Sequence, residues 1–230
     1  MTNHVRLVLF DVDGTLIRCG PQVRPLFAAA LEEVFGTAGA IGSYSFAGRT
    51  DARIVLDLVT AAGVPAERVM AALPRVRDAF VARLEAGLEA GRMTILPGVV
   101  ELLERLAAAP GVTVGLLTGN WRRGAEVKLS RLGLDRYFAF GAFGDDGIER
   151  ADLPPVALDR AAAHAGRPFA PAEVLIVGDS TEDVACAAAH GLACLAVTTG
   201  WTSGEDLRVA GARWVMDDLP AAVACGCLPL

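Results

Sequence analysis

The chain has 230 residues, is 53% hydrophobic and carries a formal net charge of −6, which suits one domain or a core domain with an insertion. This acidic balance contains no block of like charge and disfavours nucleic acid as a partner, because binding a phosphate backbone needs a basic stripe. No apolar run approaches the ~18 residues that span a bilayer and no secretory pattern is present, so we expect a cytoplasmic protein without a membrane partner, either a monomer or a homodimer.

The first predicted element is a short buried strand over residues 5–10. Asp11 and Asp13 follow it, and strand alternation puts their carboxylates on the same side of the backbone. Gly14 allows a sharp exit from the strand, and Thr15 adds a hydroxyl beside the carboxylates. For this stretch alone, an Asp-Gly turn is the alternative to a metal or phosphate site.

The segment over 22–90 has the apolar spacing of helices throughout. Glycines at 36, 39 and 42 separate the first helix from the second, Gly63-Val64-Pro65 ends the second, and a third is predicted from Pro74. A block of roughly 70 helical residues is too long for a simple crossover between strands. We therefore predict an inserted helical domain over residues 17–94.

From Pro97 onward the pattern alternates between helix and strand, which predicts parallel strands covered by helices. Helices are predicted over 98–108, 122–132, 154–165, 182–190 and 205–210 and near the C-terminus, and strands over 112–117, 174–177, 193–197 and 213–216, with a further short strand over 137–140. The predicted fold class is α/β, with a parallel sheet formed by residues 1–16 and 95–230.

Three predicted strands end in small or polar clusters. These clusters are Asp11-Val12-Asp13-Gly14-Thr15, Thr118-Gly119-Asn120 and Gly178-Asp179-Ser180-Thr181-Glu182-Asp183. In an open parallel sheet, ligands bind outside the carboxyl ends of the strands, so we expect the clusters to meet in one crevice. Each has an ordinary alternative, such as helix N-capping by Asp179 or Ser180, but three at one edge favour a site.

With these motifs in this order, the chain resembles the haloacid dehalogenase-like superfamily, and within it the phosphoglycolate phosphatase-like enzymes with a helical cap. The resemblance covers essentially the whole chain. Asp11-x-Asp13-Gly-Thr-Leu matches the first motif, Thr118 the second, and Gly178-Asp179 with Asp183 the fourth. It implies a Rossmann-like core with a cap domain inserted after the first motif.

The resemblance also implies a Mg²⁺-dependent phosphatase that hydrolyses a small phosphorylated metabolite through an aspartyl-phosphate. Asp11 would attack phosphorus, while Asp13 would protonate the leaving alcohol and then deprotonate the hydrolytic water. For this role, the site must raise the pKa of Asp13 by ~3 units from its ordinary ~3.9, and neighbouring carboxylates and an incoming phosphate push in that direction.

Oxygen ligands suit Mg²⁺, which prefers few carboxylates together with water and a substrate phosphate. The implied metal ligands are Asp11, the main-chain carbonyl of Asp13, and Asp179, with Asp183 binding directly or through water. Thr118, Gly119 and Asn120 would hold the phosphoryl oxygens, partly through backbone N–H groups.

The third motif departs from the family pattern, which places a lysine just before the helix that precedes the fourth motif. Arg150 is the nearest cation there and can clamp a phosphoryl oxygen and a carboxylate together. Lys128, the only lysine of the chain, is the rival, but its mid-helix position suggests a solvated surface side chain. Arg49, beside Gly48, resembles a cap-loop residue that contacts a substrate anion.

Two other functions compete with the phosphatase. One is a phosphosugar mutase of the same family, which returns the phosphoryl group to a substrate hydroxyl. The other is a non-catalytic phospho-ligand-binding protein. A dehalogenase is disfavoured because it has no need of Asp13. The five cysteines are odd in number and scattered, which argues against a disulfide framework, and we interpret Cys225 and Cys227 as tail residues rather than a zinc site.

Overall fold

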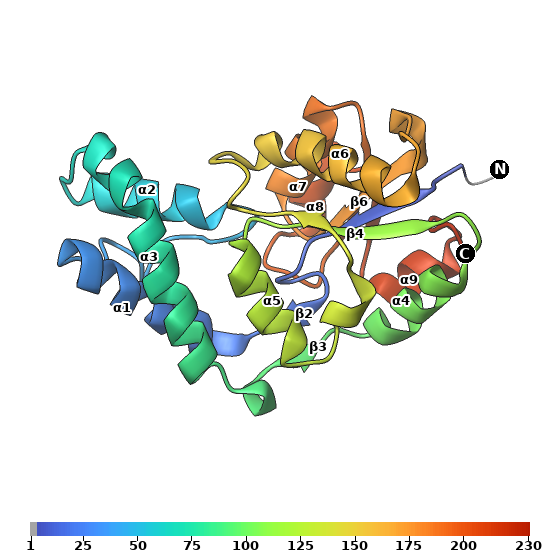
Figure 1. Cartoon of the computed structure of the whole chain (residues 1–230). Helices are drawn as coiled ribbons and strands as arrows, with labels where there is room; N and C mark the ends of the chain where they lie inside the picture. Colours follow the sequence, from blue (N-terminus) through green and yellow to red (C-terminus); the bar gives the residue numbers. More distant parts are fainter. Residues whose placement is uncertain (1–3) are drawn as a thin grey trace.

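A six-stranded parallel sheet forms the centre of the structure, a computed structural model that describes residues 4–230 (Figure 1). The strand order is β5-β4-β1-β6-β7-β8, and every neighbouring pair is parallel. The strands are β1 (Leu7–Phe10), β4 (Thr113–Leu117), β5 (Gly141–Ala142), β6 (Val174–Gly178), β7 (Ala193–Val197) and β8 (Trp214–Met216). This sheet confirms the predicted α/β, Rossmann-like class.

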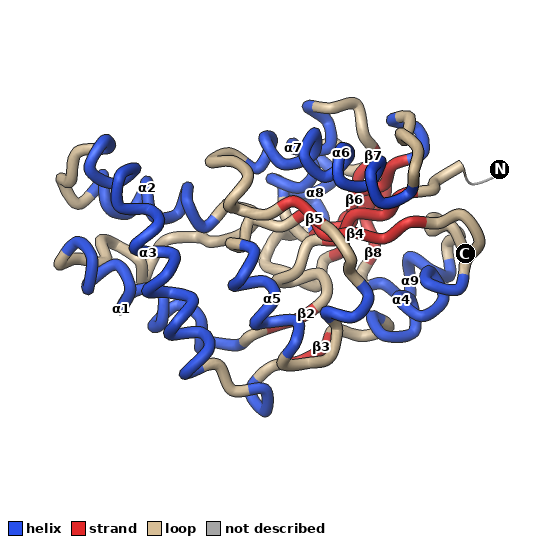
Figure 2. Tube along the Cα trace, viewed as in Figure 1, coloured by secondary structure: helices blue, strands red, loops and turns tan. Residues whose placement is uncertain are grey.

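Helices cover both faces of the sheet, as Figure 2 shows. One layer consists of α4 (Val99–Ala108), α5 (Arg122–Ser130) and α9 (Leu219–Ala224), and the other of α6 (Leu153–Ala165), α7 (Thr181–Ala189) and α8 (Gly204–Val209). In β1, Val8 and Phe10 pack in the first layer while Leu7 and Leu9 pack in the second. All four are fully buried, which explains why β1 is apolar at successive positions.

Three helices lie together beside one end of the sheet, at the left of Figure 1: α1 (Val23–Phe35), α2 (Asp51–Ala61) and α3 (Ala66–Gly87). The chain enters and leaves this group through β2 (Ile17–Arg18) and β3 (Thr94–Ile95), which pair antiparallel. This arrangement supports our division into a core of 1–16 and 95–230 and a cap of 17–94. That division stays a prediction, and its residues 1–3 lie outside the described part of the chain.

One predicted helix boundary and one predicted strand are wrong. Helix α3 begins at Ala66, not at Pro74, and contains Pro74 within it. Residues 66–73 are mostly good helix formers, so the helix continues through a proline that removes one backbone donor. No strand covers 137–140: a 3₁₀ turn occupies Asp135–Tyr137, and β5 begins only at Gly141, where its residues pair with Leu116 and Leu117.

Cys225 and Cys227 form a disulfide bond with a Cα–Cα distance of 5.5 Å, which the scattered cysteine spacing did not lead us to expect. The other three cysteines are buried free thiols. Across residues 4–230, no helix combines the length and the apolar character that a membrane span requires.

Candidate active site

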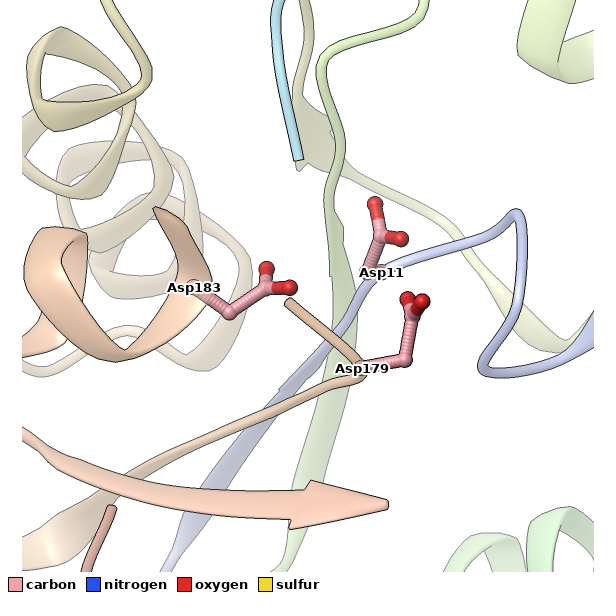
Figure 3. A group of neighbouring side chains, drawn as sticks. All are labelled: Asp11, Asp179 and Asp183. Atoms are coloured by element: carbon pink, nitrogen blue, oxygen red, sulfur yellow. The ribbon is translucent and has the colours of Figure 1, made fainter. Parts of the chain in front are cut away.

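The predicted clusters meet at the carboxyl edge of the three central strands. Asp11 follows β1, Thr118 follows β4 and Asp179 follows β6, and all three residues are at least 95% buried. Helix α7 brings Asp183 to the same place. Asp11, Asp179 and Asp183 each offer an oxygen within 4.8 Å of the others, and their carboxylates face a common space in Figure 3.

Arg150 lies against this acidic group, at the start of the 3₁₀ turn (Arg150–Asp152) before α6. Its Nη2 is 2.9 Å from Asp11 Oδ1 and 2.5 Å from Asp183 Oδ1, and it also donates to the Leu117 carbonyl at 3.0 Å. Its Nη1 donates to the Gly48 carbonyl at 3.1 Å. Arg150 therefore links the carboxylates of the core to the loop before α2 that contains Gly48 and Arg49, which we call the cap loop.

Asp183 is held by the first turn of its own helix. Ser180 is the N-cap of α7 and accepts from the Asp183 N–H, while Asp183 Oδ2 accepts from the Ser180 N–H at 3.0 Å and from its hydroxyl at 2.5 Å. This is a capping box, and it confirms the ordinary role we had considered for Ser180. The same box orients the other oxygen of Asp183 toward Arg150.

The acidic group holds more negative charge than Arg150 neutralises. Burial, opposed in part by Arg150, raises the pKa of Asp11 to about 6. Burial and the neighbouring charges of Asp11 and Asp183 raise the pKa of Asp179 to about 8. Three buried carboxylates beside one guanidinium leave two negative charges for which protons or a divalent cation must compensate.

The donor set fits a hard cation such as Mg²⁺, since these three side chains offer only carboxylate oxygens. Gly14 leaves the space that the Asp179 carboxylate fills: it has φ +89°, and a Cβ there would lie 2.5 Å from Asp179 Oδ2. Thr15 donates to Asp179 Oδ1 at 3.3 Å. The residues after β1 thus shape the site through backbone conformation as well as through their side chains.

Asp13 points to a different set of partners. Its Oδ2 accepts from Lys128 Nζ at 2.6 Å and from Asn120 Nδ2 at 2.8 Å, and Lys128 also donates to Asn120 Oδ1 at 2.5 Å. Lys128 is 3% exposed, so our interpretation of it as a solvated surface lysine is wrong. Helix α5 buries Lys128 together with Ala125, Val127 and Leu129.

The expected raised pKa of Asp13 is also wrong for this structure. Burial alone would raise it, but the charge of Lys128 and the hydrogen bonds from Lys128 and Asn120 outweigh burial and lower the pKa of Asp13. The prediction from neighbouring carboxylates and an incoming phosphate does not include Lys128, which lies 115 residues away in sequence. Asp13 is therefore an ionised carboxylate in the absence of substrate.

Among the remaining predicted residues, Thr118, Gly119 and Asn120 lie at the same edge, whereas the Arg49 side chain contacts Asp57 of α2. The Thr118 hydroxyl accepts from Asn120 Nδ2 at 2.9 Å, and both oxygen and amide of Asn120 are thus engaged within the protein. Gly119 lies under the cap loop, where a Cβ would overlap the Arg49 carbonyl oxygen. The Arg49 side chain is 38% exposed, and its guanidinium forms an ion pair with Asp57 of α2 at 3.1 Å.

The cap loop packs closely on the core. Asp51 donates its N–H to the Gly119 carbonyl at 2.7 Å, and its carboxylate accepts from the Trp121 N–H at 2.8 Å. Thr50, the N-cap of α2, donates its hydroxyl to the Ile148 carbonyl. Phe27 and Phe80 of the cap pack on Trp121 of the core, with ring centroids 6.0 and 6.1 Å away.

The geometry has parallels in known proteins. The family model for haloacid dehalogenase-like hydrolases matches residues 5–191. The chain is 30% identical over 232 residues to phosphoglycolate phosphatase 1 of Pseudomonas aeruginosa, covering 97% of this chain and 80% of the relative. It is 31% identical over 228 residues to phosphoglycolate phosphatase of Pseudomonas syringae pv. tomato, covering 98% and 80%. The crystal structure of a predicted phosphatase from Clostridium acetobutylicum has a TM-score of 0.72 at 21% identity, over 98% of this chain and 99% of that one, and this likeness shows the fold.

Proposed function

The chain belongs to the haloacid dehalogenase-like hydrolase family, as a phosphoric monoester hydrolase similar to the phosphoglycolate phosphatases, and we propose that it is a Mg²⁺-dependent phosphatase whose Asp11 becomes phosphorylated. The observation that carries this proposal is the buried Asp11 carboxylate between Arg150 and the Asp179–Asp183 pair. Its substrate is a small organic phosphate monoester, for which phosphoglycolate is the first candidate because the curated relatives carry that name.

Asp11 and Asp179 are the side chains we assign to the metal, together with the Asp13 main-chain carbonyl. Asp183 shares its two oxygens between Ser180 and Arg150, so we give it a supporting place in the metal site. Bound Mg²⁺ supplies positive charge that neutralises the carboxylates and the phosphoryl oxygens. It would take the place of the protons that the raised pKa values of Asp11 and Asp179 imply.

In the first step, an Asp11 oxygen forms a bond to phosphorus while the bond from phosphorus to the alcohol oxygen breaks. The Arg150 Nε atom is buried and has no hydrogen-bond partner within residues 4–230, which favours binding of an anion beside it. We assign it to a phosphoryl oxygen, with the Thr118 hydroxyl and the Gly119 N–H as further donors. Both hydrogen bonds at Thr118 Oγ1 are accepted ones, which leaves its proton for a ligand.

We assign the proton transfers of both steps to Asp13. Its side chain is 40% exposed, whereas that of Asp11 is 7% exposed, so we assign the departing alcohol and the incoming water to the side of Asp13. An ionised Asp13 is ready to deprotonate the hydrolytic water in the second step. Protonation of the leaving alcohol requires that an incoming phosphate dianion raise the pKa of Asp13.

The test is release of inorganic phosphate from a panel of small phosphometabolites, including phosphoglycolate, in Mg²⁺. The wild type should turn over at least one of them, and Asp11→Asn should lose more than about a thousandfold in kcat. Mass spectrometry of acid-quenched wild type should find phosphate on Asp11. Undiminished turnover by Asp11→Asn would reject the nucleophile, and turnover that needs a bisphosphate activator would favour the mutase.

A further inference from the structure

Lys128, the single lysine of the chain, has no part in the proposed chemistry, yet it is buried at the site. It lies in α5, and 4% of its side chain is exposed. Burying an ammonium group costs free energy unless strong partners compensate for the lost water. The partners it has are both residues of the site, Asp13 and Asn120.

These three side chains form a closed triangle of hydrogen bonds. Lys128 Nζ donates to Asp13 Oδ2 at 2.6 Å and to Asn120 Oδ1 at 2.5 Å, and Asn120 Nδ2 donates to the same Asp13 oxygen at 2.8 Å. Asn120 Nδ2 also donates to Thr118 Oγ1 at 2.9 Å, which fixes the amide orientation. The triangle connects Asp13, in the turn after β1, with Asn120, in the loop after β4, and with Lys128 of α5.

The triangle restricts how Asp13 can turn. Two donors, one of them charged, converge on Oδ2, and among residues 4–230 only the weaker Cys19 thiol approaches Oδ1, at 3.6 Å. Rotation of the carboxylate would break both strong bonds, one of them charge-assisted. Oδ2 is therefore the anchored oxygen, and Oδ1 is left to exchange a proton with a ligand.

We propose that Lys128 is a positioning residue that, with Asn120, anchors Asp13 Oδ2 and so presents Asp13 Oδ1 to the leaving group and the hydrolytic water. This inference rests on the proposed function, in which Asp13 is the acid and base. It assigns Lys128 a role separate from that of Arg150, which holds Asp11 and Asp183. Lys128 then holds Asp13, the proposed acid and base, while Arg150 holds Asp11, the proposed nucleophile.

The test compares two substrates in Lys128→Met, whose side chain has similar length without charge. An alkyl phosphate needs a proton on its leaving oxygen, while p-nitrophenyl phosphate leaves as a stable phenolate and needs none. The value of kcat/KM reports steps only up to departure of the leaving group. We expect kcat/KM to fall by about a hundredfold or more for the alkyl phosphate and by less than about tenfold for p-nitrophenyl phosphate.

Three further measurements sharpen the test. With p-nitrophenyl phosphate, Lys128→Met should show a burst of p-nitrophenolate, because the slowed second step lets the phosphorylated enzyme accumulate. Lys128→Arg should recover part of the alkyl phosphate activity. In a crystal structure of Lys128→Met, Asp13 should leave the position seen here. Arg123→Met, which removes a cation with 60% of its side chain exposed from the same helix, is the control and should leave both substrates unchanged.

The possible outcomes distinguish failure of the positioning role of Lys128 from failure of the proposed phosphatase function. An equal fall in kcat/KM for both substrates, with Asp13 in place, would overturn the positioning role and leave Lys128 a structural residue. Unchanged kinetics in Lys128→Met would overturn it as well. If the wild type releases phosphate from no member of the phosphometabolite panel, the proposed function fails, and the inference that depends on it fails as well.

Discussion

Arg150 and Asp11 form a buried ion pair that joins residues 139 positions apart, with Arg150 Nη2 2.9 Å from Asp11 Oδ1. Only 3% of the Arg150 side chain and 7% of that of Asp11 are exposed. The same nitrogen lies 2.5 Å from Asp183 Oδ1, so one guanidinium fixes two of the three carboxylates relative to each other. This pair orders the site before any ligand arrives.

Replacement of Arg150 by Met should lower kcat/KM for a phosphomonoester by at least about a hundredfold, because it removes a charged donor from the phosphoryl group and frees Asp11. It also leaves buried carboxylates without their counter-ion, which costs about 3 kcal/mol or more in unfolding free energy. Steady-state kinetics and urea unfolding measure the two effects. Arg150→Lys keeps the positive charge but lacks the planar guanidinium with its several N–H donors. Its kcat/KM should lie between those of the wild type and Arg150→Met.

Arg160→Met is the matched control. Arg160 lies in α6, 34% of its side chain is exposed, and its charged partner is Asp146, which is not a member of the acidic group. It should retain activity within a few-fold of the wild type. If Arg150→Met and Arg160→Met behave alike, Arg150 is not part of the site.

The motifs at the ends of the strands were predictable because polar residues that can bind a metal or a phosphate directly follow the apolar strands. Asp11, Thr118 and Asp179 follow apolar runs of strand length, and a parallel sheet collects the ends of such strands at one edge. Arg150 was predictable only through the family pattern, since nothing in its neighbourhood marks it as buried. A short turn before α6 brings Arg150 to the same edge, next to Asp11 and Asp183.

Lys128 escaped sequence reasoning for a physical reason. Its burial depends on the packing of α5 against the cap and the core, and helical periodicity does not reveal which face a single lysine presents. The error carried over to Asp13, whose pKa responds more to that one cation than to the carboxylates nearby in sequence. The start of α3 at Ala66 likewise depended on packing, which tolerates Pro74 inside the helix.

The aromatic contact between cap and core should contribute strongly to stability. Phe80 of α3 is 1% exposed, and its ring centroid lies 4.7 Å from that of Phe27 and 6.1 Å from that of Trp121. Phe80→Ala should lower the unfolding free energy by about 3–5 kcal/mol, measured by urea denaturation. Met70→Ala in the same helix, at a residue that is 43% exposed, should cost less than about 1 kcal/mol. Equal costs would mean that the cap does not pack on the core in solution as it does here.

Asp179→Asn should abolish the response to Mg²⁺. The substitution removes a charge from the buried acidic group while keeping the shape of the side chain, so metal affinity falls although the fold is retained. Thermal unfolding with EDTA and with Mg²⁺ measures the effect: the wild type should be stabilised by the metal and Asp179→Asn should not. Asp159→Asn, an exposed site on α6, should respond like the wild type. A metal response that survives in Asp179→Asn would place the cation elsewhere.

Bound metal should weaken the pH dependence of stability. The pKa values of Asp11 and Asp179, about 6 and about 8, lie above the ordinary 3.8, so the folded state binds these protons more tightly than the unfolded state. Their contribution to stability is complete below pH ~4 and is lost as the pH rises through both values. In EDTA, we expect the unfolding free energy to fall by about 2 kcal/mol between pH 6 and pH 8.

Mg²⁺ competes with the same protons, so its stabilising effect should grow from pH 6 to pH 8. Urea denaturation at both pH values, with EDTA or Mg²⁺, gives the four free energies needed. Asp179→Asn in EDTA provides the control, because without the titrating carboxyl most of the decline between pH 6 and pH 8 should disappear. A wild type whose stability in EDTA is constant over this range would mean that Asp179 is already ionised at pH 6, and that the acidic group does not need a cation to hold its charge.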